Sequence, residues 1–185
     1  MTKTITLIGT ELHLLHSVPW DDKDMEFWGV NNAHLMFNHE KFHAWFQIHT
    51  LGRCKALPYH WEWLKEEHDF PIYMQEKYDF IPSAERFPIE DCLEVSKYLT
   101  NSFSMMLAMI ISRLNKGEYK SLEEIRFYGI SFEAFHEWLE EKPSCEYFMG
   151  RLEGMGIRIW VSPKCGLLKT HILYGYETEG ESKIK

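Results

Sequence analysis

The sequence predicts a three-layer α/β sandwich built on a mostly parallel sheet of about six strands. Short runs of β-branched and aromatic residues alternate with segments of helical periodicity, the order typical of a parallel sheet covered by helices. Several runs also stop at a polar or glycine-bearing tip, such as Gly9-Thr10 and Asn31-Asn32. Because the ligand crevice of an open parallel sheet lies outside the carboxyl ends of its strands, these tips are expected to line one site.

Six segments are expected to form the strands, because each is rich in β-branched or aromatic residues and ends at a turn residue. In chain order they are residues 4–9, 25–30, 44–48, 71–74, 124–130 and 157–161. The segment Gln75–Pro88 shows no periodicity, and two interpretations stay open for it: a binding loop over the site or an ordinary surface excursion.

The clearest helix is predicted over residues 90–116, where apolar residues recur at helical spacing and Gly117 follows as a C-cap glycine. Thr100-Asn101-Ser102 interrupts this pattern with residues that favour caps over helix interiors. We therefore expect a break there, with Asn101 or Ser102 capping a second helix beneath the site. Shorter helices are expected over residues 11–17, 33–42, 59–68, 133–141 and 144–155, the last with Ser144 as its N-cap.

Length and charge limit the domain organisation and the partners. The 185 residues are expected to form one domain, residues 1–177, followed by a polar and disordered tail, residues 178–185. The formal net charge is -8, and an acidic chain without a basic stripe is a poor match for a phosphate backbone, so direct nucleic-acid binding is not expected. Aromatic residues make up 15%, which favours an aromatic-lined pocket or a homodimer contact.

Cysteine usage and hydropathy point to a cytoplasmic protein. The four cysteines form no CxxC pair and are expected to be reduced, buried thiols. The longest apolar stretch, Phe103–Ile111, is too short and too interrupted to span a bilayer, and no secretion signal precedes the first strand. We therefore expect a cytoplasmic location and no membrane partner.

A nucleotide or nucleotide derivative is the predicted ligand. The Gly9-Thr10 turn would present backbone amides to a phosphate, and Asn31-Asn32 would hold a ribose or a base. The candidate phosphate clamps are Arg53, Arg86, Arg113 and Arg151, of which Arg86 is favoured because it lies in the irregular segment. Aromatic side chains near strand ends would stack on the base. The ligand-binding residues predicted in this way are Gly9, Thr10, Trp20, Asn31, Asn32, Arg86, Ser102, Ser104, Tyr128 and Gly129.

Alternatives remain for these positions. Gly9 also suits a tight strand exit, and both asparagines suit a turn without any ligand. The sequence contains neither a GxGxxG dinucleotide fingerprint nor a P-loop, so the common phosphate-binding motifs are absent.

His49 and Glu133 are the candidate catalytic residues. His49 ends a predicted strand, where an imidazole would act as a general acid or base or contact a phosphate, unless it only positions the loop that follows. A transferase needs a base or a nucleophile close to the ligand, and Glu133 is a candidate for this role beside His49 and Asn31. His39 and His43 would share a helix face, but their spacing does not supply the further ligands that a metal needs, so neither a metal site nor a particular cofactor is predicted.

The order of the motifs resembles a group of small tailed-phage proteins of unassigned function with a Rossmann-like fold. The motifs that carry the resemblance extend over nearly the whole chain. They are Pro19-Trp20, Trp28-Gly29-Val30-Asn31, Trp45-Phe46-Gln47-Ile48-His49, Tyr73-Met74, Ile81-Pro82, Asn101-Ser102-Phe103-Ser104, Tyr128-Gly129-Ile130, Pro143-Ser144-Cys145-Glu146-Tyr147, Gly150, Gly156-Ile157, Ser162-Pro163 and Tyr174-Gly175-Tyr176-Glu177.

At a coarser level the first third looks like the nucleotide-binding start of sialyltransferase-type and pterin-pyrophosphokinase-like Rossmann proteins. In those families a glycine-rich turn after the first strand meets an asparagine after the second, which here would be Gly9-Thr10 and Asn31. This chain departs from the pattern at Glu11, whose carboxylate would repel a phosphate. The resemblance implies the fold and a nucleotide-like ligand.

Two classes of function follow from these patterns, and a structural or assembly role is the third. The first is a nucleotide-dependent transferase of a phage-type cytoplasmic protein. The second is a binding protein that sequesters a nucleotide signal as an inhibitor of host antiviral defence, with a second subunit closing the site. A transferase needs a base beside the ligand, whereas a sequestering protein needs deep burial of the ligand by aromatic and arginine side chains.

Overall fold

Seven parallel strands form one sheet in the computed structural model of the chain, which describes residues 2–11, 15–36, 41–132, 137–163, 165–169 and 174–175. The order across the sheet is β5-β4-β3-β2-β1-β6-β7, so β1 lies near the middle. The strands are β1 (Thr4–Ile8), β2 (Met25–Val30), β3 (Ala44–Gln47), β4 (Ile72–Met74), β5 (Ala84–Arg86), β6 (Glu124–Tyr128) and β7 (Arg158–Val161).

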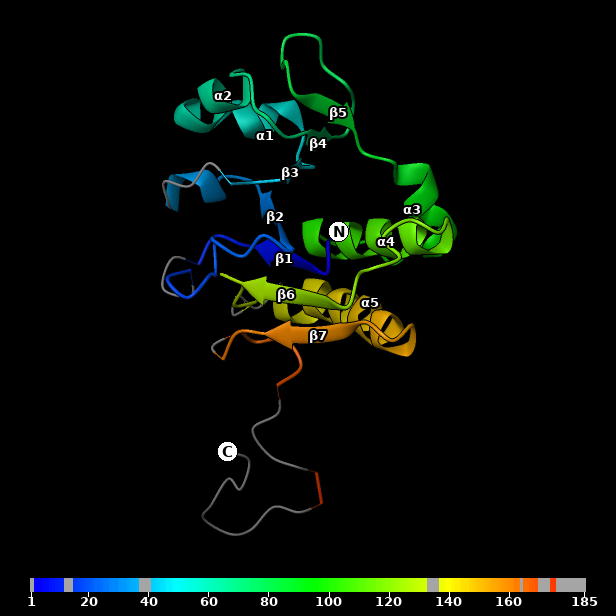
Figure 1. Ribbon diagram of the computed structural model, residues 1–185. Coiled ribbons are helices and arrows are strands. Elements are labelled where there is room, and N and C mark those ends of the chain that lie inside the picture. The colour runs from blue at the N-terminus through cyan, green and yellow to red at the C-terminus, as the bar shows by residue number, and fades with distance from the viewer. Residues whose placement is uncertain are drawn as a thin grey trace.

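Helices cover both faces of the sheet, as Figure 1 shows. One face carries α3 (Ile89–Val95), α4 (Ser102–Asn115) and α5 (Lys142–Gly154). The π-helical segment η3 (Glu137–Glu141) leads directly into α5. The other face carries the 3-10 turn η2 (Ala33–Met36), α1 (Leu51–Lys55) and α2 (Pro58–Leu64). Each helical layer has its own core cluster against the sheet, so the predicted three-layer α/β sandwich is confirmed.

The central strand shows why the sheet is parallel. All five residues of β1 are buried, because both faces of the strand lie under helices. β1 pairs with β2 and with β6 in the same direction, with Thr4 opposite Met25 on one side and Glu124 on the other. This register brings the carboxyl ends of β1, β2 and β6 to the same edge of the sheet.

One strand, β5, was not predicted and lies in the segment that the sequence predicts to be irregular. It has three residues, two of which are the exposed and charged Glu85 and Arg86, so it has no hydrophobic pattern. It is an edge strand, held by its parallel pairing with β4 and by the Phe87 N–H, which donates to Met74 O. Charged residues on a short edge strand discourage pairing with other chains.

The predicted break in the long helix is confirmed. Residues 96–101 separate α3 from α4, and Asn101 is the N-cap of α4. Ser144 is not an N-cap, which corrects the expectation from the sequence: Pro143 lies in the first turn of α5, where proline is tolerated, and η3 runs straight into α5. The short helix α1 was not predicted.

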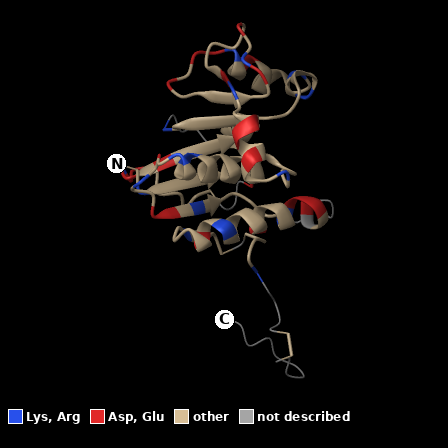
Figure 2. Ribbon diagram, turned by 90° about the vertical axis from the view of Figure 1, so that its right-hand side faces the viewer, with Lys and Arg blue, Asp and Glu red and all other residues tan. Residues whose placement is uncertain are grey.

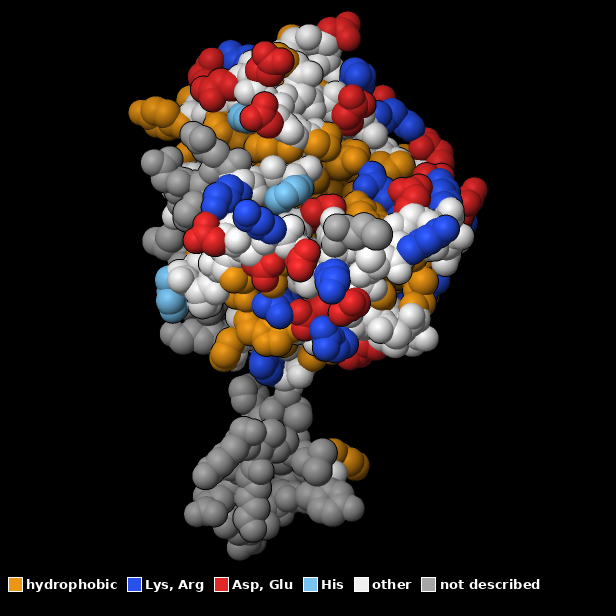
Figure 3. Space-filling view, in the orientation of Figure 1, with side chains coloured by type: hydrophobic (Ala, Val, Ile, Leu, Met, Phe, Trp, Pro, Cys, Tyr) orange, Lys and Arg blue, Asp and Glu red, His pale blue; other side chains and the backbone are white. Residues whose placement is uncertain are grey.

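Charged side chains are spread over the surface without a single continuous patch on the face that Figure 3 shows, where acidic and basic groups are intermixed. Figure 2 shows acidic residues gathered on α3 and where η3 leads into α5. Within the described part of the chain, no helix has the length and apolarity needed to cross a membrane.

Candidate functional site

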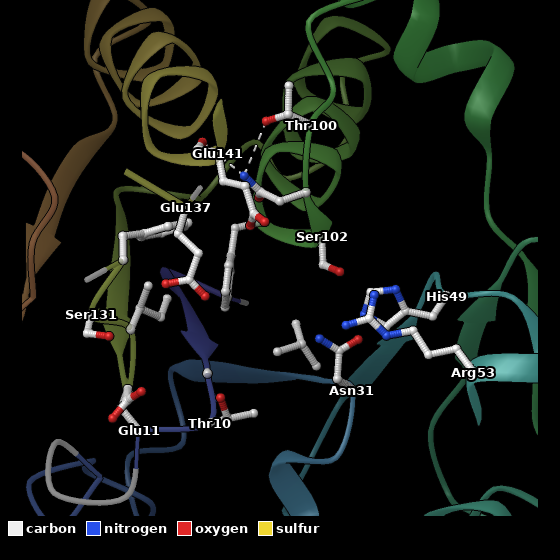
Figure 4. Close-up of a pocket in the computed structure, with 17 residues that line it drawn as sticks. Thr10, Glu11, Asn31, His49, Arg53, Thr100, Ser102, Ser131, Glu137 and Glu141 are labelled. Carbon is white, nitrogen blue, oxygen red and sulfur yellow. Dashed lines mark hydrogen bonds between the residues drawn. The ribbon is translucent and has the colours of Figure 1, made fainter. Parts of the chain in front are cut away.

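A cavity of about 440 Å³ opens at the carboxyl edge of the sheet, where the ends of β1, β2, β3 and β6 meet the first turn of α4 and the η3 segment (Figure 4). Of the residues predicted to bind a ligand or catalyse a reaction, the structure brings six to this cavity. They are Gly9, Thr10, Asn31, His49, Ser102 and Gly129.

At the floor of the cavity, the chain segment after β1 closely approaches the segment after β6. The Gly9 N–H donates to Tyr128 O and the Glu11 N–H donates to Gly129 O, both at 2.9 Å. A Cβ on Gly9 would lie 2.2 Å from Gly129 O, and Gly129 itself has a φ of +67°. Both glycines are therefore needed for this approach. Two of the turn amides are used within the protein, so the turn is not an open phosphate cradle, and the Thr10 hydroxyl is its main contribution to the cavity (Figure 4).

Asn31 follows β2 and has an amide oxygen that accepts no hydrogen bond from the described residues. Its φ is +50°, a conformation that asparagine tolerates better than most residues. Its N–H donates to Phe46 O and its carbonyl accepts from Trp45 Nε1, both at 3.0 Å. The backbone is thus held on two sides, while the buried Oδ1 has no hydrogen-bond partner among the residues that the structure describes. A buried acceptor without a partner is costly unless a ligand or water supplies a donor.

His49 and Arg53 form the wall beside Asn31 (Figure 4). Burial, and then the charge of Arg53, lower the pKa of His49, so the imidazole is neutral at neutral pH. Arg53 lies in α1, is exposed, and makes no ion pair within the described residues. It is also the only arginine or lysine among the described residues that line the cavity.

The first turn of α4 points its amides at the same space. Asn101 Oδ1 accepts from the Ser104 N–H at 2.9 Å, and Ser104 Oγ accepts from the Asn101 N–H at 3.1 Å, which together form a capping box. Ser102 and Phe103 line the cavity, and within the described residues their amides have no acceptor. A helix N-terminus of this kind favours an anion.

Three acidic residues, together called the acidic wall, also line the cavity. Glu11 follows β1, and Glu137 and Glu141 extend from η3 towards the middle of the space (Figure 4). The Asn101 Nδ2–H donates to Glu141 O at 2.9 Å, which ties η3 to the cap of α4. Within the described chain, no three His, Cys, Asp or Glu side chains are grouped to hold a metal ion.

The other predicted site residues lie elsewhere. Arg86 is on the edge strand β5 and pairs with Glu90 and Glu76, because the strand order places β5 three positions away from β2. Asn32 does not line the cavity and accepts the Leu35 N–H at the start of η2. Ser104 is buried in the capping box.

Two aromatic residues predicted to stack on a base do not line the cavity: Tyr128 is buried in the core, and Trp20 is partly buried against it. Trp20 packs on Phe27, with ring centroids 5.0 Å apart, and Tyr128 packs on Trp160 at 4.8 Å. Phe103 and Phe132 are the aromatic residues that line the cavity. Glu133 lies outside the described residues, as does His39.

A chain of histidines lies behind the cavity wall. His34 Nε2 is 2.8 Å from His60 Nδ1, and His60 Nε2 is 2.8 Å from Gln47 Oε1 at the end of β3. Because Gln47 Oε1 can only accept, His60 donates from Nε2 and accepts from His34. Burial, then the neighbouring histidines, lower the pKa of His34 to about 4, and burial, then His49, lower that of His60 to about 4.

These histidines are expected to make the protein sensitive to acid. Their folded-state pKa values lie below 6.5, so their neutral forms stabilise the fold fully above pH 6.5 and this stability is lost as the pH falls to about 4. We expect the free energy of unfolding to fall by roughly 2–4 kcal/mol between pH 6.5 and pH 4, after discounting for partial solvent exposure. Urea unfolding at a series of pH values from 7 to 4 measures this free energy. His60→Gln should flatten the dependence, while the exposed His16→Asn should leave it unchanged.

Comparisons with known proteins identify the fold. No protein-family model matches the sequence, and no curated protein matches it. Among solved structures, the sialyltransferase CstII from Campylobacter jejuni in complex with cytidine-5'-monophosphate has a TM-score of 0.53 at 15% identity, over 91% of this chain and 86% of that chain. CstII in complex with a trisaccharide acceptor and CMP has a TM-score of 0.55 at 15% identity, over 90% and 86%. The chain therefore shares a Rossmann-like α/β fold with these proteins.

Proposed function

We propose that the cavity binds a nucleotide or nucleotide derivative and that the chain is a nucleotide-dependent transferase. One observation carries the proposal: hydrogen-bond donors from separate elements converge on one side of a cavity at the carboxyl edge of a parallel sheet. The solved sialyltransferases that share the fold were determined with CMP, which supports the same ligand class.

The phosphate is placed between Arg53 and the first turn of α4. A guanidinium binds phosphate oxygens through paired N–H groups, and the amides of Ser102 and Phe103 supply the positive end of a helix. Neutral His49 adds one N–H donor from the same side. In this arrangement Thr10 and Asn31 form hydrogen bonds with the hydroxyl groups of the ribose.

The group to be transferred then extends towards the acidic wall. The bond between a phosphate oxygen and the transferred carbon breaks, and the phosphate leaves with the electron pair. An acceptor oxygen forms a new bond to that carbon, and its proton passes to the carboxylate of Glu137. In this proposal His49 stabilises the leaving phosphate, and Glu137 takes the role of base that the sequence assigns to Glu133.

A nucleotide is expected to raise the melting temperature of the protein. At a ligand concentration of about 100 times Kd the native state gains about 2.7 kcal/mol, which corresponds to roughly 5–10 °C for a domain of this size. Thermal shift with the four ribonucleoside 5′-monophosphates and their diphosphates measures it. Absence of a shift with every nucleotide at millimolar concentration would contradict the proposal.

Native mass spectrometry separates turnover from sequestration. A nucleotide that co-purifies at full occupancy and stays intact over hours with sugar and hydroxyl acceptors would support sequestration rather than transfer. Release of free nucleotide that depends on an acceptor, and that Glu137→Gln abolishes without loss of nucleotide binding, is the result expected for a transferase.

A further inference from the structure

The first turn of α4 is held by buried polar side chains, two of which belong to α5. Ser104, Ser144 and Cys145 are fully buried, and none of the three is among the described residues that line the cavity. We propose that Ser144 is a positioning residue for the phosphate of the nucleotide, because it holds the Asn101 cap and, with it, the amides that face the cavity. This inference rests on the proposed function and adds a residue that supports the same site.

The direction of the hydrogen bonds follows from one carbonyl oxygen. Glu141 O can only accept, so the Ser144 O–H donates to it, at 3.0 Å. Ser144 Oγ also lies 2.5 Å from Thr100 Oγ1, and because the Ser144 proton is already used, the Thr100 O–H donates to Ser144. Asn101 Nδ2 donates to the same Glu141 O at 2.9 Å (Figure 4). The segment before α4 and the start of α5 are therefore joined through a shared acceptor.

Asn101 connects these bonds to the terminus of α4. Its Oδ1 accepts from the Ser104 N–H at 2.9 Å and lies 3.3 Å from Cys145 Sγ. Burial raises the pKa of Cys145 to about 12, so the thiol stays protonated and donates to Asn101 Oδ1. Because the amide of Asn101 is bonded at both its oxygen and its nitrogen, the first turn of α4 has a fixed orientation relative to α5.

Phosphate binding depends on that orientation. Ser102 and Phe103, whose amides are proposed to bind the phosphate, directly follow Asn101, while Arg53 lines the same cavity from α1. Hydrogen bonds weaken steeply when donor and acceptor are poorly aligned, so a tilted first turn would weaken binding of a phosphate that contacts both groups. Supporting hydrogen bonds behind a binding site supply this alignment. Loss of the Ser144 hydroxyl would leave the Thr100 O–H without its acceptor and loosen the link to α5.

Ser144→Ala tests the proposal by its effect on the phosphate alone. Calorimetry measures the affinities of the four ribonucleoside 5′-monophosphates and, by competition, of the four ribonucleosides. For the preferred base, the ratio of the two dissociation constants gives the contribution of the phosphate. We expect Ser144→Ala to reduce this ratio about 3- to 10-fold, the effect of roughly one hydrogen bond, and to leave the affinity for the nucleoside within about twofold. A residue that only stabilises the fold would lower the melting temperature and leave the ratio unchanged.

Ser112→Ala is the matched control for this substitution. Ser112 is buried near the other end of α4 and is not among the described residues that line the cavity, so the ratio should not change.

Variants of Thr100 test whether the Thr100–Ser144 bond is responsible. Thr100→Val removes the hydroxyl and should reduce the ratio as Ser144→Ala does, while Thr100→Ser keeps the hydroxyl and should retain the ratio. Because both residues act through one bond, Thr100→Val combined with Ser144→Ala should stay within about twofold of either single variant. Effects that multiply in the double variant would overturn the proposal. Should Ser144→Ala fail to fold, the two Thr100 variants decide.

Hydrogen exchange of the Ser104 amide gives a second readout, by NMR and without ligand. Exchange is expected to be faster in Ser144→Ala than in the parent protein and unchanged in Ser112→Ala, because only the first variant loosens the bond to Asn101 Oδ1. Equal exchange in Ser144→Ala and the parent protein contradicts the positioning role.

The outcomes separate the two levels of inference. If the parent protein binds no nucleoside monophosphate, the proposed function fails and the positioning role fails with it. If monophosphates bind, and neither Ser144→Ala nor Thr100→Val lowers the ratio, nucleotide binding stands and the positioning role alone is overturned.

Discussion

Replacing Arg53 with alanine is expected to weaken nucleotide binding by roughly 10- to 100-fold, the loss typical of a charge-assisted hydrogen-bond pair. Arg53 is the only cation lining the cavity within the described residues, so no other described lining residue supplies a comparable charge. Because it is exposed and makes no ion pair there, the free energy of unfolding without ligand should change by less than about 0.5 kcal/mol. Calorimetry with the preferred nucleotide, together with urea unfolding, measures both quantities.

Arg86→Ala is the matched control. Arg86 pairs with Glu90 and Glu76 on the edge of the sheet, away from the cavity, so its removal should leave nucleotide affinity unchanged. Arg53→Lys keeps the charge but loses the planar fork, and an intermediate affinity is expected. If Arg53→Ala binds as tightly as the parent protein, the phosphate lies elsewhere in the cavity.

Removing Arg53 should also change the titration of its neighbour. The Arg53 charge contributes to lowering the pKa of His49, so His49 in Arg53→Ala should titrate at higher pH than in the parent protein. An NMR titration of the histidine ring protons follows this shift. It reports the Arg53–His49 contact without any ligand, so it tests the geometry of the wall independently of the proposed function.

The sequence predicts that the residues at the strand ends lie together, because this proximity follows from the topology of the sheet. Once strands alternate with helices, the carboxyl ends of β1, β2 and β3 must reach the same edge, and Gly9, Asn31 and His49 come with them. The cap at Asn101 was also predictable, since a polar interruption in an apolar helical pattern indicates a new N-terminus.

The residues that were missed, or placed wrongly, depend on information that local patterns lack. Tyr128 is the last residue of β6 and its ring packs on Trp160, whereas Gly129 follows the end of the strand and lines the cavity. The value of Arg86 as a clamp depended on the strand order, which puts it at the far edge. Glu137, which was missed, reaches the site through a π-helical segment. Arg53 was one of four candidate phosphate clamps but was not the favoured one, because the short helix α1 that carries it leaves no clear periodic signal.

The close approach of the two chain segments at Gly9 predicts that Gly9→Ala strongly destabilises the protein. Gly9→Ala would place a methyl group 2.2 Å from Gly129 O and 2.8 Å from Ile130 Cγ1. The first of these atoms is backbone and cannot rotate away, so the ends of β1 and β6 must separate. That movement strains the bonds from the Gly9 N–H to Tyr128 O and from the Glu11 N–H to Gly129 O. Overpacking of this kind costs about 1–3 kcal/mol, which lowers the melting temperature by roughly 2–12 °C.

The same substitution is expected to weaken nucleotide binding, because Thr10 and Glu11 sit on the displaced turn and both line the cavity. Gly150→Ala is the matched control: apart from its chain neighbours and the backbone of its own helix, no described atom lies within 4 Å of the added methyl group. Alanine within α5 should leave stability equal or higher. A Gly9→Ala protein with the parent melting temperature and affinity would show that the turn tolerates a wider crossing. We expect Gly9→Ala to lose both stability and nucleotide affinity, and Gly150→Ala to lose neither. That result would link the close approach of the two strand ends to the shape of the binding cavity.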